Sequence, residues 1–366
     1  ANAALIEAAN RQFHELDHVL FAGATHEPAV RLAERLVEVT PDGLDRVFYS
    51  DNGSTAVEVA LKIVLQNFAQ NGEPQRQVFI ALDGAYHGDT FGSMSVGDPD
   101  PFFQAYRPFL FECVRIAPTE EALQGALQSL GERAAGFIVE PLIQGAAGMR
   151  VHSSEFLRAA RSACDTHGVP FIADEVMTGF GRTGALFACE RAGIRPDLMC
   201  LAKGLTGGIF PLSVTLASQS LFEGFLSEDR NRTFFHGHTF TAHPVGCAIA
   251  LASLDLCLES GTPARLEHIG SRLFARLQSL HNHPGVSHLR HLGGMVALDL
   301  VGCDSSESGY LSQIGPAVHA AALERGVLIR PLGNVVYALP PACTTDAQVD
   351  HIADVILHLV ERYAIR

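Results

Sequence analysis

Two short apolar runs between residues 170 and 204 constrain the fold more than any other feature of the sequence. The first run, residues 171–173, leads into Asp174, and the second, residues 198–201, is followed almost directly by Lys203. Both runs are too short and too apolar to be amphipathic helices, so we predict two buried parallel strands. Ligands of open α/β sheets bind at the carboxyl ends of the strands. We therefore expect the acid and the amine to share one crevice.

An amine and a carboxylate in one crevice suit pyridoxal phosphate chemistry. This cofactor needs an amine for its Schiff base and an anion that keeps its ring nitrogen protonated. Lys203 would be the amine and Asp174 the anion. A salt bridge at the strand ends is the alternative interpretation, and these two residues alone do not decide between the two.

The composition favours an enzyme that acts on small molecules. A chain of 366 residues predicts two domains, or one large α/β domain with an appendage. With 47% hydrophobic and 18% charged residues, the chain can build a sizeable core. The formal charge of −14, which no run of Lys or Arg reverses locally, argues against a nucleic-acid or anionic membrane surface. No apolar stretch approaches the ~20 residues of a membrane span.

The cysteines and the N-terminus bear on the compartment. The eight cysteines are scattered without a CxxC pair, so they are predicted to be reduced thiols of a cytoplasmic protein. The N-terminus lacks the basic region and following apolar region of a secretory signal. Because the chain opens without Met and inside a helical pattern, we expect that an upstream segment is missing.

Strands and helices alternate over the first two thirds of the chain, which predicts a mostly parallel sheet. Helices are predicted at residues 1–18, 27–40, 55–70, 120–130, 155–167 and 245–258, and further strands at residues 46–50, 77–82, 135–140 and 212–217. The first helix is amphipathic, and the residues on its apolar face are Leu5, Ala9, Phe13 and Leu16.

From about residue 263 the pattern changes to that of a smaller α+β domain. Its helices are predicted at residues 263–280, 314–325 and 346–362, and its strands at residues 286–290, 296–300, 327–330 and 335–338. The sequence therefore predicts an N-terminal helical segment (1–21), a large cofactor-binding domain (22–262) and a small C-terminal domain (263–366).

Two turns are candidate phosphate sites. Gly53 and Ser54 lie between a predicted strand and a predicted helix, where free N–H groups and the helix dipole favour an anion. A serine at such a turn is also a good N-cap, so a purely structural role is the alternative. Thr239 precedes the helix predicted at residues 245–258 and is a further candidate phosphate donor.

Tyr86 and Arg330 are candidate ligand-binding residues. Tyr86 follows the strand predicted at residues 77–82 and could stack on an aromatic cofactor, or else pack under a loop. Arg330 ends the strand predicted at residues 327–330, where its guanidinium could present a bidentate fork to a substrate carboxylate. An ordinary surface arginine is the alternative.

Three histidines lie close together in the sequence, at positions 236, 238 and 243. No acidic residue or cysteine lies among them, and HxH in a loop is a weaker zinc signature than HExxH. We therefore predict no metal site.

Together these residues resemble a known family over nearly the whole chain. Asp-Glu-Val at 174–176, Gly-Phe-Gly-Arg-Thr-Gly at 179–184 and Lys203 resemble the signature of the class III aminotransferases. Four further segments are similar to the diaminopelargonate aminotransferases of biotin synthesis, namely SDNGSTAVEVALK (50–62), YHGDTFGSMSVGDP (86–99), CLAKGLTGG (200–208) and LIRPLGNVVYALPP (328–341). The resemblance implies the aspartate aminotransferase fold of the fold type I pyridoxal phosphate enzymes, an α/β fold whose large domain has a mostly parallel sheet and whose small C-terminal domain is α+β.

The resemblance also implies roles for the residues around the cofactor pyridoxal 5'-phosphate. Lys203 would hold the cofactor covalently and then act as general acid and base, and Asp174 would pair with the pyridine nitrogen. Val176 would pack on the ring face opposite Tyr86. The turn formed by Gly53 and Ser54 would hold the phosphate.

A second group of residues implies a homodimer with active sites at the subunit interface. Gly237, His238 and Thr239 would reach the active site of the neighbouring subunit, where Thr239 would bind the phosphate. Arg330 would receive the terminal carboxylate of the substrate, and Tyr86 and Gly237 would also touch the substrate.

The reaction implied is transamination of 8-amino-7-oxononanoate to 7,8-diaminononanoate, with S-adenosylmethionine or lysine as amino donor. Asp89 occupies the position that helps to accommodate this donor. The well-studied members that use S-adenosylmethionine have Pro where this chain has His238, and lysine-using relatives often have His there. The family also lines its pocket with Tyr and Trp from an N-terminal segment, whereas this chain has no Trp and begins after that segment.

Two alternatives to this function stay open from the sequence. Another class III ω-amino acid or diamine aminotransferase would share every cofactor residue. A chain without cofactor could serve only as a structural or regulatory subunit.

Overall fold

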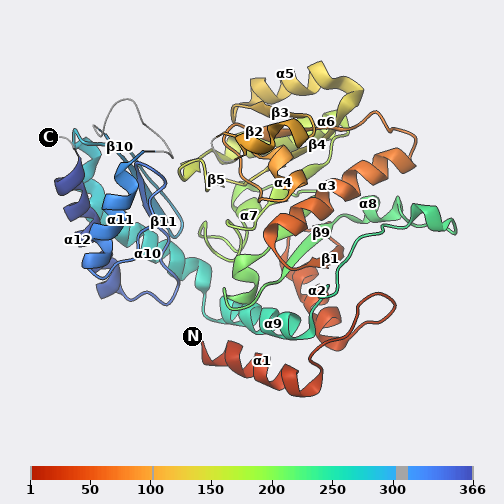
Figure 1. Cartoon of the computed structure of the whole chain (residues 1–366), viewed down its shortest axis with the longest axis horizontal. Coiled ribbons are helices and arrows are strands. Elements are labelled where there is room, and N and C mark those ends of the chain that lie inside the picture. Colours follow the sequence, from red (N-terminus) through yellow and green to blue (C-terminus); the bar gives the residue numbers. More distant parts are fainter. Residues whose placement is uncertain (1, 101–102, 302–311, 365–366) are drawn as a thin grey trace. The chain divides into compact units, whose positions relative to one another are not determined.

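The computed structural model of this chain describes residues 2–100, 103–301 and 312–364, and the order of its elements can be followed in Figure 1. The chain divides into two compact units. The first contains Ala1–Leu142, His152–Phe180 and Phe187–Ser260, and the second contains Ile143–Val151, Gly181–Leu186 and Gly261–Arg366.

Two loops of the second unit lie far earlier in the sequence than its helices. In the first loop, Met149 accepts a hydrogen bond at its carbonyl oxygen from the Arg290 guanidinium, at 3.0 Å. In the second, Arg182 donates to the carbonyl oxygen of Pro340, also at 3.0 Å. The sequence pattern assigns both loops to the large domain, because hydrogen bonds over such distances along the chain leave no local signal.

The first unit is built on a seven-stranded sheet of order β1-β9-β8-β7-β4-β2-β3. Its strands are β1 (Arg46–Ser50), β2 (Val78–Leu82), β3 (Cys113–Ile116), β4 (Ala134–Val139), β7 (Phe171–Asp174), β8 (Leu198–Leu201) and β9 (Ser213–Ala217). The pairs from β8 through β7, β4 and β2 to β3 are parallel, whereas β9 is antiparallel to both β8 and β1. The predicted mostly parallel sheet is therefore confirmed.

The reversed direction of β9 follows from its short connection to β8. A parallel neighbour requires a crossover of a dozen or more residues, usually with a helix. Only residues 202–212 separate the two strands, and they contain the short 3₁₀ turn η3 (Lys203–Thr206). The chain therefore turns back on itself directly after Lys203.

Helices cover both faces of this sheet. The helices of the first unit are α1 (Ala3–Glu15), α2 (Glu27–Val39), α3 (Gly53–Gln70), α4 (Phe91–Val96), α5 (Glu120–Leu130), α6 (Ser154–His167), α7 (Ala188–Ala192), α8 (Gln219–Glu223) and α9 (Pro244–Glu259). On one face, α3 packs against Phe79, Ile138 and Ile172. On the other, Phe156 of α6 makes an edge contact with Phe137. Burial on both faces explains why the strands are continuous apolar runs.

Helix α1 lies beside α9 in Figure 1 and packs against it. Its buried residues are Leu5, Ala8 and Gln12, whereas Phe13 is 53% exposed. The predicted apolar face is therefore wrong at Phe13. Helix α9 covers a narrower stripe of α1 than the hydrophobic pattern of α1 suggests. Within this contact, Leu5 packs against Val245 and Ile249.

The second unit combines a three-stranded antiparallel sheet with helices. Its sheet has the order β10-β11-β12, and its elements are β10 (Val286–Leu292), β11 (Met295–Leu300), β12 (Val335–Ala338), α10 (Thr262–Leu277), α11 (Ile314–Glu324) and α12 (Asp346–Tyr363), with a small ribbon of β5 (Ile143–Gln144) and β6 (Arg150–Val151). Its core joins the three helices to the sheet and includes Leu273, Leu298 and Ile356.

The strand predicted at residues 327–330 does not form. Its backbone bonds instead to α11: the amide of Val327 donates to the carbonyl of Ala322 at 3.1 Å, and the carbonyl of Ile329 accepts from His319 Nδ1 at 2.6 Å. Arg330 therefore does not end a strand, and it lies in the loop that leads to β12.

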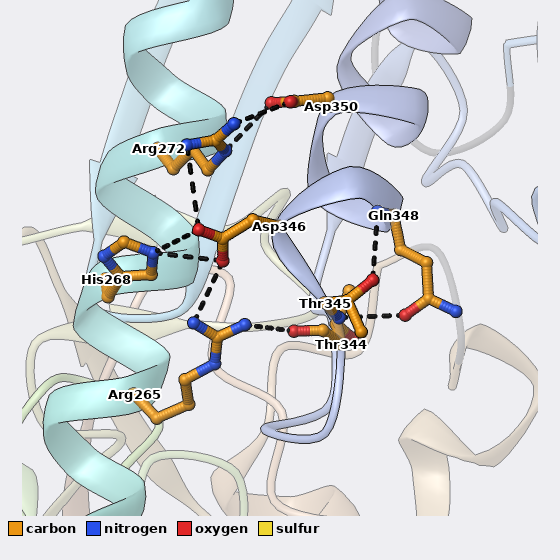
Figure 2. Close-up of polar contacts among 8 residues, drawn as sticks. All are labelled: Arg265, His268, Arg272, Thr344, Thr345, Asp346, Gln348 and Asp350. Carbon is orange, nitrogen blue, oxygen red and sulfur yellow. Dashed lines mark hydrogen bonds and ion pairs between the residues drawn. The ribbon is translucent and has the colours of Figure 1, made fainter.

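Helices α10 and α12 are joined by a ladder of ion pairs (Figure 2). Arg265 and His268 both contact Asp346, at 3.0 and 3.1 Å, and Arg272 forms two hydrogen bonds with Asp350, at 2.6 and 2.9 Å. The start of α12 is held by a capping box of Thr345 and Gln348.

Replacing Asp350 by asparagine tests this ladder. The hydrogen bonds from Arg272 lower the pKa of Asp350 below its ordinary value. Stabilisation by a carboxylate whose folded pKa is depressed is present above the unfolded pKa of about 3.9 and is lost as pH falls through the folded pKa. The Asp350→Asn protein should therefore melt below the wild type at pH 6, and the two melting temperatures should converge near ~pH 2.

Thermal melts followed by circular dichroism at several pH values would check this expectation. Asp45→Asn is the matched control, because Asp45 is exposed and has no ion pair within the described ranges of the chain. A deficit of the Asp350→Asn protein that stays constant down to pH 2 would contradict the ion-pair explanation.

Candidate active site

Asp174 and Lys203 lie at the carboxyl ends of neighbouring parallel strands. Asp174 is the last residue of β7 and is paired in register with Cys200 of β8, and Lys203 begins the turn that follows β8. Because β7 and β8 run in the same direction, Asp174 and Lys203 lie at the same edge of the sheet. The structure thus brings together the acid and the amine that the sequence pattern singled out.

Lys203 is one of two lysines in the chain. The other, Lys62, is exposed on α3, where its Nζ lies 2.9 Å from His236 Nδ1 and 5.7 Å from the centre of the Phe234 ring. Lys203 is therefore the one side-chain amine placed at the strand ends, and its backbone has the left-handed φ of +47° that L residues rarely adopt.

Asp174 is held by two donors in a buried environment. Its side chain accepts a hydrogen bond from His87 Nδ1 at 2.7 Å and another from the amide of Val176 at 3.1 Å. Asp174 is 5% exposed and His87 is 3% exposed. Because a carboxylate only accepts, Nδ1 of His87 carries a proton, and this contact fixes the orientation of the carboxylate.

The sequence reasoning did not identify His87 as the neighbour of Asp174. It belongs to the Tyr-His-Gly segment after β2, which the resemblance includes, but no role was predicted for it. Its Nε2 is buried, and the described residues offer it no hydrogen-bond partner. Its position directly after the candidate ring-stacking Tyr86 is the sequence signal that could have identified it.

Glu175, next to Asp174, has a different task. It is fully buried and accepts hydrogen bonds from the hydroxyl of Thr178 and from the amides of Ala188 and Cys189, at 2.6, 3.0 and 2.7 Å. Burial raises the pKa of Glu175, although these hydrogen bonds oppose the effect. It closes the turn between β7 and α7, and its hydrogen-bond donors differ from those of Asp174.

Gly53 and Ser54, the predicted phosphate site, lie in the first turn of α3. The amides of Gly53 and Ser54 have no acceptor within the described residues, as is usual for the first turn of a helix. Asn52 is the N-cap, so the alternative role of Ser54 as N-cap is wrong. A Cβ on Gly53 would lie 2.7 Å from Val176 Cγ1, so the helix start packs directly on a predicted ring-contacting residue.

Ser54 is tied to the loop after β2. Its Oγ accepts from the amide of Thr90 at 3.0 Å and lies 2.8 Å from Thr90 Oγ1. Gly88, with a φ of +122°, approaches so closely that a Cβ there would lie 2.4 Å from Ser54 Oγ. The loop that carries Tyr86 and His87 is thereby fixed against the helix start.

Tyr86 and Asp89 form a second polar pair in this loop. The hydroxyl of Tyr86 donates to Asp89 Oδ1 at 3.0 Å, and the amide of Tyr86 donates to Glu140 Oε1 at 3.2 Å. The Tyr86 ring stacks on Phe103, with centroids 6.3 Å apart. The structure therefore shows the loop packing that was the alternative for Tyr86, and it also brings Tyr86 and Asp89 together.

Gly237, His238 and Thr239 lie in the loop before α9, and the first and last of these are exposed. The amide of His238 donates to Thr241 Oγ1 at 2.9 Å. Helix α9 begins at Pro244, close to its predicted start at residue 245, and Thr239 precedes it in the sequence as predicted. A turn at residues 239–242 intervenes.

Arg330 belongs to the second unit and is exposed. It lines a cavity of about 560 Å³ in that unit together with His319 and Leu328. Within the described part of the chain, no acidic side chain forms an ion pair with its guanidinium.

Within the described ranges, the chain has neither a cluster of metal ligands nor a single membrane-spanning helix. No group of three or more His, Cys, Asp or Glu side chains is placed to hold a metal ion. No single helix there is both long and apolar enough to cross a membrane, and one pair of consecutive helices, Pro244–Glu259 and Thr262–Asn282, meets the length and composition test together.

Comparison with known proteins identifies the family. The family model "Aminotransferase class-III" matches residues 1–360. The chain is 47% identical to the adenosylmethionine-8-amino-7-oxononanoate aminotransferase of Synechococcus elongatus, over 99% of this chain and 87% of that protein. It is 42% identical to the enzyme of the same name from Geobacter sulfurreducens, over 95% and 82% of the two chains.

Solved structures agree with these sequence relatives. The adenosylmethionine-8-amino-7-oxononanoate aminotransferase of Methanocaldococcus jannaschii superposes with a TM-score of 0.94 at 32% identity, covering 100% of this chain and 86% of the other. A PLP-bound amine transaminase from an uncultivated Pseudomonas species gives a TM-score of 0.92 at 31% identity, covering 100% and 88%.

Proposed function

Because this chain belongs to the class III aminotransferases and has their fold, we propose that it aminates 8-amino-7-oxononanoate to 7,8-diaminononanoate in biotin synthesis. The observation that carries the proposal is the near-full-length identity of 47% to an enzyme named for this reaction. Several further relatives with the same name are 35–42% identical. The fold class and the aminotransferase activity predicted from the sequence are confirmed.

We propose pyridoxal 5'-phosphate as the cofactor, and the residues present fit it. The buried carboxylate of Asp174 suits a protonated ring nitrogen, the unengaged amides of Gly53 and Ser54 suit a phosphate, and Lys203 supplies the amine. When bound, the cofactor supplies an electron sink for the substrate carbon that loses its proton.

The chain's own residues would then perform three tasks. Once the donor amine has displaced it, Lys203 would remove the proton from the donor's α-carbon and would give the proton back in a later step. Asp174 would keep a proton on the ring nitrogen, and His87 would hold Asp174 in place through Nδ1. Val176, which packs against Gly53, would limit the movement of the cofactor ring.

Several charged and polar side chains would take part in substrate recognition. We propose that Arg330 binds the terminal carboxylate of the acceptor, because its guanidinium is exposed beside a cavity. Tyr86 and Gly237 would touch the substrate, and Asp89, hydrogen-bonded to Tyr86, would help to accommodate the donor.

We propose a homodimer in which Gly237, His238 and Thr239 serve the partner's site. The same loop exposes Phe235 and Phe240, at 72% and 56%. Large aromatic side chains exposed this far favour a protein contact over contact with water. We also propose the cytoplasm as the compartment, which the seven free cysteines of the described chain support.

The acceptor specificity separates this proposal from its nearest alternative. Amine and ω-transaminases from several bacteria superpose almost as well, with TM-scores of 0.90–0.93, so a class III ω-amino acid or diamine aminotransferase is the second candidate. We expect kcat/KM for 8-amino-7-oxononanoate to exceed that for pyruvate and 2-oxoglutarate by at least about a hundredfold, because a matched substrate makes interactions that shorter acceptors lack.

The assay should use each acceptor with S-adenosylmethionine and with lysine as donor. The names of the relatives support S-adenosylmethionine, and the comparison of the two donors would settle the question that His238 raises. If pyruvate were the better acceptor with either donor, the ω-transaminase alternative would replace the proposal.

A further inference from the structure

We propose that Ser253, on the buried face of α9, is a positioning residue that holds the turn carrying the reactive Lys203. This inference rests on the proposed role of Lys203 as the amine that binds pyridoxal phosphate. It concerns how the fold keeps that amine in one geometry, which the identity of the family does not reveal.

The backbone at Lys203 needs outside support. Its φ of +47° lies in the left-handed region, which L side chains rarely adopt and which persists where the surroundings enforce it. The short turn η3 contributes two local restraints, since the amide of Leu205 donates to the carbonyl of Ala202 and the amide of Gly207 donates to the carbonyl of Gly204, both at 3.0 Å. A single turn of this kind is weakly held by its own hydrogen bonds.

A second left-handed residue packs against this turn. Phe180 has a φ of +57°, and a Cβ built on Gly204 would lie only 2.9 Å from the Cβ of Phe180 and 3.0 Å from its Cδ2. The Phe180 ring is itself held by Phe187, with centroids 5.6 Å apart. The two turns therefore constrain each other, and neither can relax without moving the other.

Helix α9 fastens both turns through side chains one helical turn apart. The hydroxyl of Ser253 donates to the carbonyl of Gly204 at 3.2 Å, and the thiol of Cys257 lies 3.9 Å from the carbonyl of Phe180. Both side chains are buried, at 8% and 7% exposure. A serine in a helix usually bonds to its own helix four residues back, whereas Ser253 reaches across to the residue that follows Lys203.

The contact made by Ser253 is the stronger of the two. A hydroxyl is a good donor, and 3.2 Å is a normal hydrogen-bond length, whereas a thiol is a weak donor. Removing the hydroxyl would break this link between η3 and α9 and leave the Gly204 carbonyl with the hydrogen bond from the Gly207 amide alone. The Lys203 amine would then sample geometries in which it cannot reach the cofactor. The cofactor's own binding groups would remain in place.

The test follows the attachment of pyridoxal phosphate to cofactor-free protein, trapped with borohydride and located by mass. All proteins carry Lys62→Arg, which leaves Lys203 as the one lysine of the chain. In Ser253→Ala we expect the maximal rate of attachment to fall about fivefold, the effect of one lost hydrogen bond, while the cofactor concentration giving half the maximal rate stays unchanged. Ser253→Cys, which keeps a weak donor, should recover part of the rate.

Thr215→Val is the matched control. It removes a buried hydroxyl that donates to the carbonyl of Ala56 at 2.7 Å in the same unit, and it should lower the melting temperature without slowing attachment. Equal maximal rates for Ser253→Ala and its parent, or equal slowing by Thr215→Val, would overturn the inference. If the parent itself gained no mass at Lys203, the proposed function would fail instead.

Discussion

Lys203→Ala is expected to lower turnover by at least about a thousandfold and to abolish covalent attachment of pyridoxal phosphate. The reason is that the same amine is asked to bind the cofactor and to move the proton at the reacting carbon. No second side chain can replace it, since Lys62 is engaged with His236 on the surface of α3. Steady-state turnover and the mass of borohydride-treated protein would measure the two effects.

The chain offers a matched control, because it contains two lysines. Lys62→Arg keeps the positive charge and the contact with the Phe234 ring, so the variant should keep wild-type turnover and gain the cofactor mass at Lys203. The proposed mechanism would be wrong if the wild-type protein gained the cofactor mass at Lys62, or if the Lys203→Ala enzyme were active. A chain that gained no adduct at all would instead favour a role without cofactor.

The sheet was predictable because its strands carry a strong local pattern. Residues 171–173 and 198–201 are short, fully apolar and followed by charge, and they form β7 and β8 with the expected parallel pairing. The helix start at Gly53 was predictable for a similar reason, since turn residues directly precede a long helical pattern. Local signals of this kind depend on the immediate neighbours alone.

The partner of Asp174 was not predictable, because it depends on the order of the strands in space. His87 follows β2 and Asp174 ends β7, and in the sheet only β4 separates these two strands. His87 and Asp174 are 87 positions apart in the sequence, and nothing between them indicates this order. The hydrogen bond at 2.7 Å is therefore a finding of the structure.

The wrong strand prediction at residues 327–330 has a tertiary cause. This segment is a short, largely apolar run, which favours a strand, but its backbone bonds to α11. A neighbouring element therefore decided the backbone conformation that the local pattern had left open.

Asp174→Asn is expected to lower kcat by about two to four orders of magnitude, on the scale of losing a charge that stabilises a transition state. Asparagine preserves the shape of the side chain and can still accept from His87 and Val176, so the fold around it should survive. It cannot supply the negative charge that favours a protonated ring nitrogen. The absorbance of the bound cofactor and kcat would report the change.

Glu175→Gln separates this effect from the loss of any buried carboxyl group. Glu175 is the next residue in the sequence, and its fully buried side chain stabilises the turn before α7. The Glu175→Gln protein should therefore have a clearly lower melting temperature and a kcat close to that of the wild type. The Asp174→Asn protein should instead have a much lower kcat and a melting temperature close to that of the wild type. A cofactor analogue methylated at the ring nitrogen carries the positive charge without help, so it should restore part of the activity of Asp174→Asn. Failure of the analogue to raise kcat in that variant, while it binds normally, would mean that Asp174 acts elsewhere than at the ring nitrogen.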